Sequence, residues 1–330
     1  MDKKYIFVEY FHDRDKQLIT HPIYEMPEEE FLKIAPANEK ILQIYRFEEL
    51  FAILVDNFFA FNNVILSYAD KARLQTLCSA TYFQKRIDVN RATLNFLATL
   101  NLYQEFLENN VEDVFDKKFW DSNTSFQRCL VMRNYIQHIE FYPIISNVSY
   151  TQCDLNVMLA SVRFQLEASE LKIEKLHKRT QEKFKQFFDM TEKIDLYEII
   201  NQGMEEIQLV QGKLRKMPLY TVDYAESKEL LLDVQQKISP ESSSALGHSL
   251  YFVSDGDKND LNTCFLATDT IKFIDENIKR YRCSRSNSNQ FITTAPKDFV
   301  DKCNNKIFTP AIDREWQRRT QEKMKGVPNA

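Results

Sequence analysis

The strongest structural signal in the chain is the run FEELFAILVDNFFAFNNVILSY, residues 47–68. Its apolar side chains recur every three or four residues, at Leu50, Ile53, Leu54, Phe58, Phe61 and Ile65. This spacing is typical of an amphipathic α-helix that buries one face. The run therefore predicts a long core helix.

Helical signals continue on the C-terminal side of this run. Asp88 is a good N-cap residue for a second amphipathic helix over residues 89–107. The cluster DSNT at residues 121–124 precedes a third helix over about 126–140, which Pro143 prevents from continuing. We expect these helices to pack as a bundle.

The composition of the 330 residues supports a mainly α fold. Glycine is scarce, with 5 residues, and proline amounts to 9, so few sites favour the tight turns of β-sandwiches and barrels. The formal net charge of −5 argues against a strongly basic nucleic-acid coat and leaves room only for a local basic surface. The six cysteines are dispersed without a Cys-x-x-Cys pair, which indicates reduced thiols and no zinc site.

Residues 1–40 predict an N-terminal cap rather than a domain. They open with a predicted strand at residues 5–10 and continue through Pro22, Pro27 and Pro36. Closely spaced prolines favour irregular backbone, so we expect a loop-rich lead-in after the strand.

Membrane and export signals are weak in the sequence. The apolar residues 5–11 are broken by Glu9 and are too short for a secretory signal. The stretch 50–61 contains Asp56 and Asn57 and is shorter than the roughly 20 residues that a membrane span needs. We therefore expect a cytoplasmic protein without a membrane partner.

A seven-residue apolar repeat predicts a fourth, very long helix. The repeat follows Leu166, Ile173, Phe187 and Ile194. Asp154 stands at a capping position before it, and Pro218 ends it. We expect a coiled helical hairpin or long bundle helix here, and we place the helical domain at residues 41–217.

The last third of the chain changes in character. Residues 239–249 are rich in serine, residues 249–253 are strand-like, and an Asp-Gly turn follows at 255–256. Residues 218–330 therefore predict a small mixed α/β appendage, to which the sequence assigns no role.

The segment Arg133-Asn134-Tyr135-Ile136-Gln137-His138 carries the chemistry-bearing groups. It places a permanent cation, an amide and an imidazole within six residues. These groups suit metal-free RNA cleavage: a base for the 2′-hydroxyl, a cation for the phosphorane and an amide that orients the phosphate. On a helical wheel the polar side chains lie opposite an apolar arc formed by Cys129, Met132, Tyr135, Ile136 and Ile139.

An arginine, a polar residue, three variable residues and a histidine on a bundle helix resemble the motif of the HEPN superfamily. The resemblance covers about residues 41–217, where only the six-residue motif is sharp. It implies a metal-independent endoribonuclease of prokaryotic antiviral defence or toxin–antitoxin systems, with Arg133, Asn134 and His138 as catalytic residues and no cofactor. Family members often have a glycine after the histidine, whereas Ile139 stands here.

The resemblance also implies partners. HEPN ribonucleases usually pair two such helices across a homodimer, and they act on an RNA substrate under an antitoxin or sensor protein. Inactive relatives serve as binding modules, so a helical interaction or scaffold protein that binds a protein or RNA is the alternative.

Two charged regions are further candidates. Lys175, Lys178, Arg179 and Lys185 form a basic run that predicts RNA binding, although a solvated outer helix face has the same pattern. Acidic residues also crowd the last third, at Asp255, Asp257, Asp260, Asp269, Asp275 and Asp298. Carboxylates of this kind can bind Mg²⁺, but no ligand spacing is present, so a hydrophilic loop is the preferred interpretation and no metal site is predicted.

Overall fold

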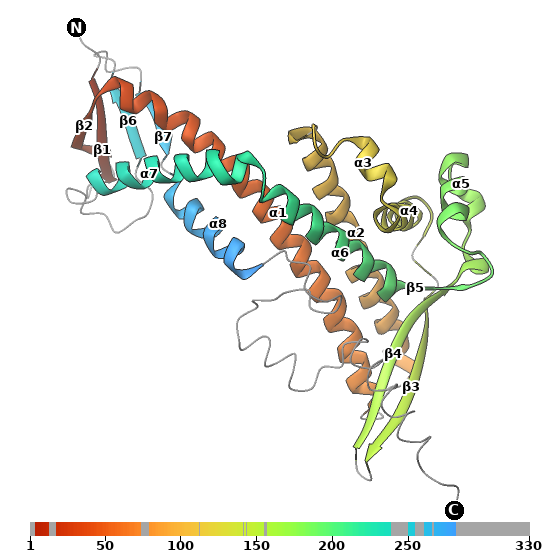
Figure 1. Ribbon diagram of the computed structural model, residues 1–330. Coiled ribbons are helices and arrows are strands. Elements are labelled where there is room, and N and C mark those ends of the chain that lie inside the picture. Colours follow the sequence, from red (N-terminus) through yellow and green to blue (C-terminus); the bar gives the residue numbers. More distant parts are fainter. Residues whose placement is uncertain are drawn as a thin grey trace, which may run out of the picture. The chain divides into compact units, whose positions relative to one another are not determined.

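A computed structural model describes most of the chain and is mainly helical, as the composition predicts (Figure 1). It describes residues 4–12, 18–73, 79–111, 113–140, 142, 144–154, 157–238, 250–254, 261–265 and 267–281. Strands β1, β6 and β7 are described by their backbone alone, and so is β2 up to residue 23.

The described residues group into two compact units. Those up to Glu49 and from Gln211 onward form unit 1, and Leu50–Val210 form unit 2. These units are defined by compactness and not by independent folding. The predicted domains 1–40, 41–217 and 218–330 therefore stay predictions.

Unit 1 combines a four-stranded antiparallel sheet with helices. The sheet order is β2-β1-β6-β7. Its strands are β1 (Lys4–His12), β2 (Leu18–Met26), β6 (Leu250–Ser254) and β7 (Leu261–Phe265). Its helical parts are the first half of α1 (Glu28–Arg73), the end of α6 (Leu196–Leu214), the π-helical turn η3 (Leu219–Asp223), α7 (Tyr224–Ile238) and α8 (Thr268–Arg280).

Strand β1 confirms the predicted N-terminal strand, and β6 confirms the strand-like segment near residue 250. The loop-rich lead-in is wrong, because Pro22 lies in β2 and Pro36 lies inside α1. Ile34 and Ile41 of α1 are fully buried, and this burial outweighs the local preference of proline for irregular backbone. The predicted Asp-Gly turn at 255–256 lies outside the described residues.

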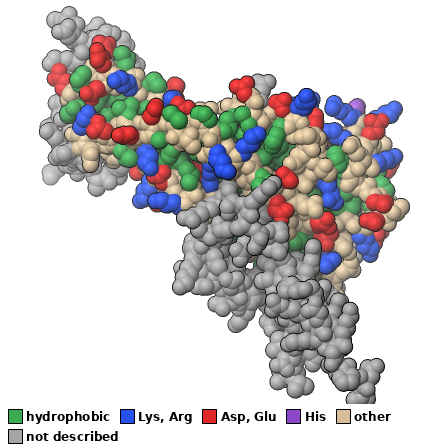
Figure 2. All heavy atoms as spheres, viewed as in Figure 1, with side chains coloured by type: hydrophobic (Ala, Val, Ile, Leu, Met, Phe, Trp, Pro, Cys, Tyr) green, Lys and Arg blue, Asp and Glu red, His purple; other side chains and the backbone are tan. Residues whose placement is uncertain are grey.

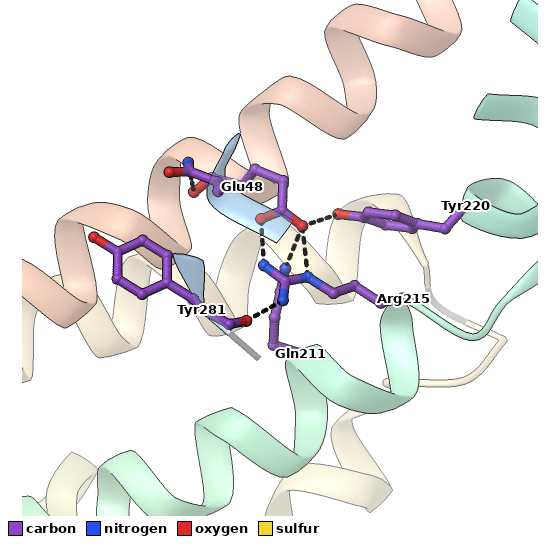
Figure 3. A network of polar contacts seen from close by, with 6 residues as sticks. Glu48, Gln211, Arg215, Tyr220 and Tyr281 are labelled. Carbon is purple, nitrogen blue, oxygen red and sulfur yellow. Dashed lines mark hydrogen bonds and ion pairs between the residues drawn. The ribbon is translucent and has the colours of Figure 1, made fainter. Parts of the chain in front are cut away.

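A polar network ties the helices of unit 1 together (Figure 3). The buried Glu48 carboxylate accepts hydrogen bonds from Gln211 Nε2 at 2.8 Å, Arg215 Nε at 2.9 Å and the Tyr220 hydroxyl at 3.0 Å. Arg215 also donates to the Tyr281 carbonyl. These three donors come from the end of α6, the turn that follows it and η3, so the network fixes how α1 meets this segment within unit 1.

Unit 2 combines helices with a small sheet. In chain order its helices are the second half of α1, α2 (Ser79–Asn110), α3 (Lys117–Ser122), α4 (Thr124–His138), α5 (Lys178–Phe187) and most of α6. The sheet has the antiparallel order β3-β4-β5, with β3 (Ile144–Asp154), β4 (Val157–Glu167) and β5 (Lys193–Asp195). Two 3₁₀ turns, η1 (Ala168–Glu170) and η2 (Ile173–Lys175), lead from β4 to α5.

The long pair α1–α2 confirms the two amphipathic helices expected around residues 47–68 and 89–107. Phe58 of α1 lies 6.2 Å from Phe96 of α2 between ring centroids, and Asn57 donates to Thr99 Oγ1 at 2.8 Å. The predicted cap is wrong, because α2 begins at Ser79 and Asp88 lies inside it, where it accepts a 2.9 Å hydrogen bond from Tyr68.

The predicted long helix over residues 154–217 is wrong. These residues form β4, two 3₁₀ turns, α5, β5 and α6 instead. Leu166 and Ile194, which the repeat assigns to one helical seam, are cross-strand partners in β4 and β5. Val162, Phe164 and Leu166 are all buried, and this alternation is the two-residue period of a strand.

Helix α1 passes a length-and-composition test for a membrane span over Glu28–Ala69. A buried core helix of a soluble protein passes the same test, and α1 buries Phe47, Phe51 and Leu54 almost completely. The expected cytoplasmic location stays a prediction.

Candidate functional site

The candidate catalytic motif lies on α4, whose ends are fixed by local contacts. The Asn123 side chain accepts a 2.8 Å hydrogen bond from the Phe126 N–H, which confirms that the cluster at 121–124 caps this helix. The helix ends at His138, and the Ile139 N–H donates to the Tyr135 carbonyl at 2.9 Å.

The apolar side of α4 anchors the motif. Cys129, Met132, Tyr135 and Ile136 are buried, as the helical wheel predicts. Tyr135 stacks on Tyr142 with 5.6 Å between ring centroids, and the Tyr142 hydroxyl donates to the Met132 carbonyl. These contacts prevent α4 from rotating about its axis, so its polar side keeps one orientation.

The predicted catalytic residues lie on the opposite side of α4. Arg133 and Asn134 are partly exposed and His138 is exposed. Arg133 Nη1 donates to Asn134 Oδ1 at 3.1 Å, so the amide orients the guanidinium. Within the described part of the chain, no hydrogen bond or ion pair engages the His138 side chain.

Arg133 and His138 are not brought into contact within one chain. Five helical positions separate them by about 7.5 Å along the axis and about 140° around it. One copy of α4 therefore does not bring the Arg133 guanidinium and the His138 imidazole into contact with the same phosphate-sized group.

Helix α5 lies beside α4 in Figure 1 and packs on it through aromatic contacts. Phe184 lies 6.3 Å from Tyr135 between ring centroids, and the Arg128 guanidinium lies 5.1 Å above the Phe188 ring. Lys183 donates to Gln127 Oε1 at 2.9 Å. The packing sets the outer face of α5 next to the helix that carries the motif.

The predicted RNA-binding residues do not lie on one long helix, as the sequence predicted, but on two separate elements. Lys178, Arg179 and Lys185 are exposed on α5, whereas Lys175 is exposed on η2. No described residue forms an ion pair with any of them. Glu182 lies among the exposed residues of α5, so the face is basic but not uniformly so.

Sequence reasoning missed a group of charges at the C-terminal end of α4. Lys172 Nζ lies 2.7 Å from Glu140 Oε2, and the Lys172 N–H donates to the Tyr135 hydroxyl at 3.3 Å. The pKa of Glu140 is lowered, chiefly by the Lys172 hydrogen bond and further by the charges of Lys172, Lys175 and Arg86, against an opposing effect of desolvation. The only sequence signal is that Glu140 follows the motif histidine by two residues.

The acidic residues of the last third gain no support as a metal site. Asp275 accepts hydrogen bonds from Tyr224 at 2.9 Å and from Lys228 at 2.6 Å, which ties α8 to α7. Asp255, Asp257, Asp260 and Asp298 lie outside the described residues.

Figure 2 shows Lys and Arg side chains interspersed with Asp and Glu on the face in view, rather than gathered in one block. On this face, basic side chains can contact a polyanion only locally (Figure 2). Comparisons with protein-family models, curated proteins and solved structures find no match.

Proposed function

We propose that this protein is a metal-independent endoribonuclease of the HEPN type. The observation that carries the proposal is the presentation of Arg133, Asn134 and His138 together on the solvent side of α4, while the other side is buried. A permanent cation, an orienting amide and an imidazole on one surface are the groups that phosphodiester transfer requires.

The reaction assigns one role to each group. The neutral His138 imidazole takes the proton of an RNA 2′-hydroxyl, whose oxygen attacks the adjacent phosphorus. The new 2′-O–P bond forms as the P–O5′ bond breaks, which leaves a 2′,3′-cyclic phosphate and a 5′-hydroxyl. Arg133, held by Asn134, neutralises the charge that develops on the phosphorane oxygens.

The active form is proposed to be a homodimer. Protonation of the leaving 5′-oxygen needs a second acid, and one α4 helix carries a single histidine. Two facing copies of α4 supply two arginines and two histidines, and a twofold axis makes the two contributions equivalent. A complete site then draws its groups from both chains.

The exposed cations Lys175, Lys178, Arg179 and Lys185 are proposed to bind the RNA backbone near α4. Their proximity to the motif helix rests on the packing of α5. The proposed setting is prokaryotic antiviral defence or a toxin–antitoxin pair in the cytoplasm, where an antitoxin or sensor protein restrains cleavage.

The direct test is cleavage of a mixed-sequence RNA in the presence of EDTA. Wild-type protein should release products with 2′,3′-cyclic phosphate ends, and His138→Ala should reduce the rate by about 100-fold or more, the usual contribution of a general base. Gln137→Ala is the matched control, because Gln137 is exposed on the same helix turn. Loss of activity with EDTA, or unchanged cleavage by His138→Ala, would contradict the proposal.

A mixing experiment tests the composite site. Arg133→Ala and His138→Ala proteins, each impaired alone, should regain part of the activity when they are mixed and allowed to exchange subunits. Sedimentation should show a dimer for the wild type. Full activity of a monomer would refute the dimeric site.

A catalytically silent interaction protein is the alternative, and an exposed apolar pair on α2 favours it. Phe83 and Ile87 lie one turn apart and are 67% and 56% exposed. In that case wild-type and His138→Ala proteins would be equally inactive on RNA, and Phe83→Ser would disrupt binding of a protein partner.

A further inference from the structure

Three cations act on the carboxylate of Glu140, which follows His138 and the C-terminal end of α4 by two residues. Lys172 contacts Glu140 at 2.7 Å, and Lys175 follows it on η2. Arg86 comes from α2: Asn90 Nδ2 donates to the Arg86 carbonyl at 3.0 Å and to the Tyr142 carbonyl at 3.4 Å. The hydrogen bonds of Asn90 thus hold this turn of α2 against the segment that follows α4.

The carboxylate of Glu140 lies among these cations. The same charges lower its pKa, the Lys172 hydrogen bond being the largest cause. Glu174 is the second carboxylate that acts on Lys172, so the group comprises three cations and two carboxylates. Arg86, Lys172 and Lys175 are all exposed, and so a ligand from solution can reach them.

We propose that Glu140 is an intramolecular substitute for an RNA phosphate: it pairs with Lys172, within the field of Arg86 and Lys175, until the RNA backbone displaces it at the end of the helix that carries His138. The inference rests on the proposed function and adds to it a phosphate subsite and a built-in competitor. A phosphodiester carries the same unit charge as the carboxylate and offers acceptor oxygens to the same donors.

The exchange is easy because the ion pair is exposed. The side chains of Lys172 and Glu140 are 45% and 39% exposed, and ion pairs of this kind contribute little to stability. A phosphate that takes the place of Glu140 therefore does not disturb the fold. The displaced carboxylate then turns to water, where it is well solvated.

The position of the subsite matches the proposed chemistry. Glu140 follows His138 by two residues, and Lys172 is held by its N–H on the Tyr135 hydroxyl of the same helix. A backbone phosphate bound here would hold its nucleotide at the C-terminal end of α4, the helix end that carries the proposed base.

The test uses binding of a fully 2′-O-methylated RNA oligonucleotide, which offers no 2′-hydroxyl and cannot be cleaved. Glu140→Gln should tighten binding about fivefold, the order expected when one unit charge at contact distance in water is removed. Lys172→Gln should weaken binding and reduce the slope of log affinity against log salt by about 0.7, one counterion of a single strand.

Glu167→Gln is the matched control. Lys193 and Glu167 form a similar ion pair at 2.9 Å, with side chains 47% and 30% exposed, but they lie on β5 and β4. This variant should leave RNA affinity unchanged. Equal affinities of Glu140→Gln and wild type, with thermal melting unchanged, would overturn the inference.

The two proposals fail separately. If wild-type protein cleaves RNA but neither variant alters binding, the subsite is refuted and the ribonuclease stands. If Glu140→Gln tightens binding while no protein cleaves RNA, the phosphate contact stands and the catalytic proposal falls.

Discussion

Replacement of Glu48 by alanine should destabilise the protein more than any substitution of an exposed carboxylate. Glu48 is fully buried, and the Arg215 side chain that pairs with it is only 11% exposed. Removal of one partner from a buried ion pair typically costs about 3–5 kcal/mol, because the remaining charge is left without compensation. Gln211 and Tyr220 also lose this acceptor, so we expect a value in the upper part of this range.

Urea unfolding of the full chain, followed by far-UV circular dichroism, measures the effect. With a slope of about 2 kcal/mol per molar urea, a loss of about 4 kcal/mol lowers the midpoint by about 2 M. Tyr220→Phe removes a single donor to the carboxylate and should cost about 1–3 kcal/mol. Glu39→Ala is the control, since Glu39 is exposed on the same helix, and it should stay within about 0.5 kcal/mol of wild type.

The expected loss of unfolding free energy is largest for Glu48→Ala, smaller for Tyr220→Phe and smallest for Glu39→Ala. If Glu48→Ala unfolds within about 1 kcal/mol of wild type, the network does not stabilise unit 1 as its geometry indicates. A double variant that also carries Arg215→Ala should lose less than the sum of the single changes, because the stranded charge is gone.

Other substitutions test the packing and the charges of unit 2. Gly203→Ala should destabilise by about 1–3 kcal/mol through overpacking, because its Cβ would clash with the buried Cys129 sulfur; Cys129→Ala should relieve the clash, measured by the same urea titration. Asn123→Ala should cost about 1 kcal/mol, since the Phe126 N–H loses its cap, and Asn123→Asp should restore this stability only in part, because its carboxylate would replace the amide that donates to Glu206 at 2.8 Å. Burial raises the pKa of Asp195, against hydrogen bonds from backbone N–H groups. Its protonated form is therefore favoured in the folded state, and the free energy of unfolding of wild type relative to Asp195→Asn should fall as pH rises above about 4. A difference that grows with pH would contradict this assignment.

The helices α1, α2 and α4 could be predicted because their signals are local. Apolar spacing identified α1 around Phe58, and a cap residue, Asn123, identified the start of α4. Their limits were less accurate, since burial of residues such as Ile34 extends α1 past Pro36. Local preference sets where a helix can form, and tertiary contacts set how far it continues.

The predicted long helix failed for a different reason. A seven-residue repeat samples the sequence sparsely, and Leu166 and Ile194 fit it although they meet across two strands. The alternation of Val162, Phe164 and Leu166 was the stronger signal, because consecutive positions report the period directly. Basic residues attributed to one helix face consequently fall on η2 and α5.

The residues of the candidate site also fall into a group that the sequence reveals and a group that it does not. Arg133, Asn134 and His138 are visible in the sequence because one helix carries them. The charges around Glu140 are not, since Arg86 comes from α2 and Lys172 from the segment after β4. Only the folded chain brings these together, and no spacing rule links them.

Asn90 has a consequence for how this sequence can diverge. Its side-chain nitrogen donates to the Tyr142 carbonyl, while its oxygen accepts the Tyr142 N–H at 3.0 Å. A carboxylate cannot donate and an ammonium cannot accept, so neither replaces an amide, which has a donor and an acceptor at its two ends. Distant homologues should therefore keep an amide at this position and an aromatic residue in place of Tyr142, even where the surface charges have drifted. A sequence pattern that combines these two positions with the Arg-Asn-x3-His run would detect such homologues even when the overall sequence identity is low.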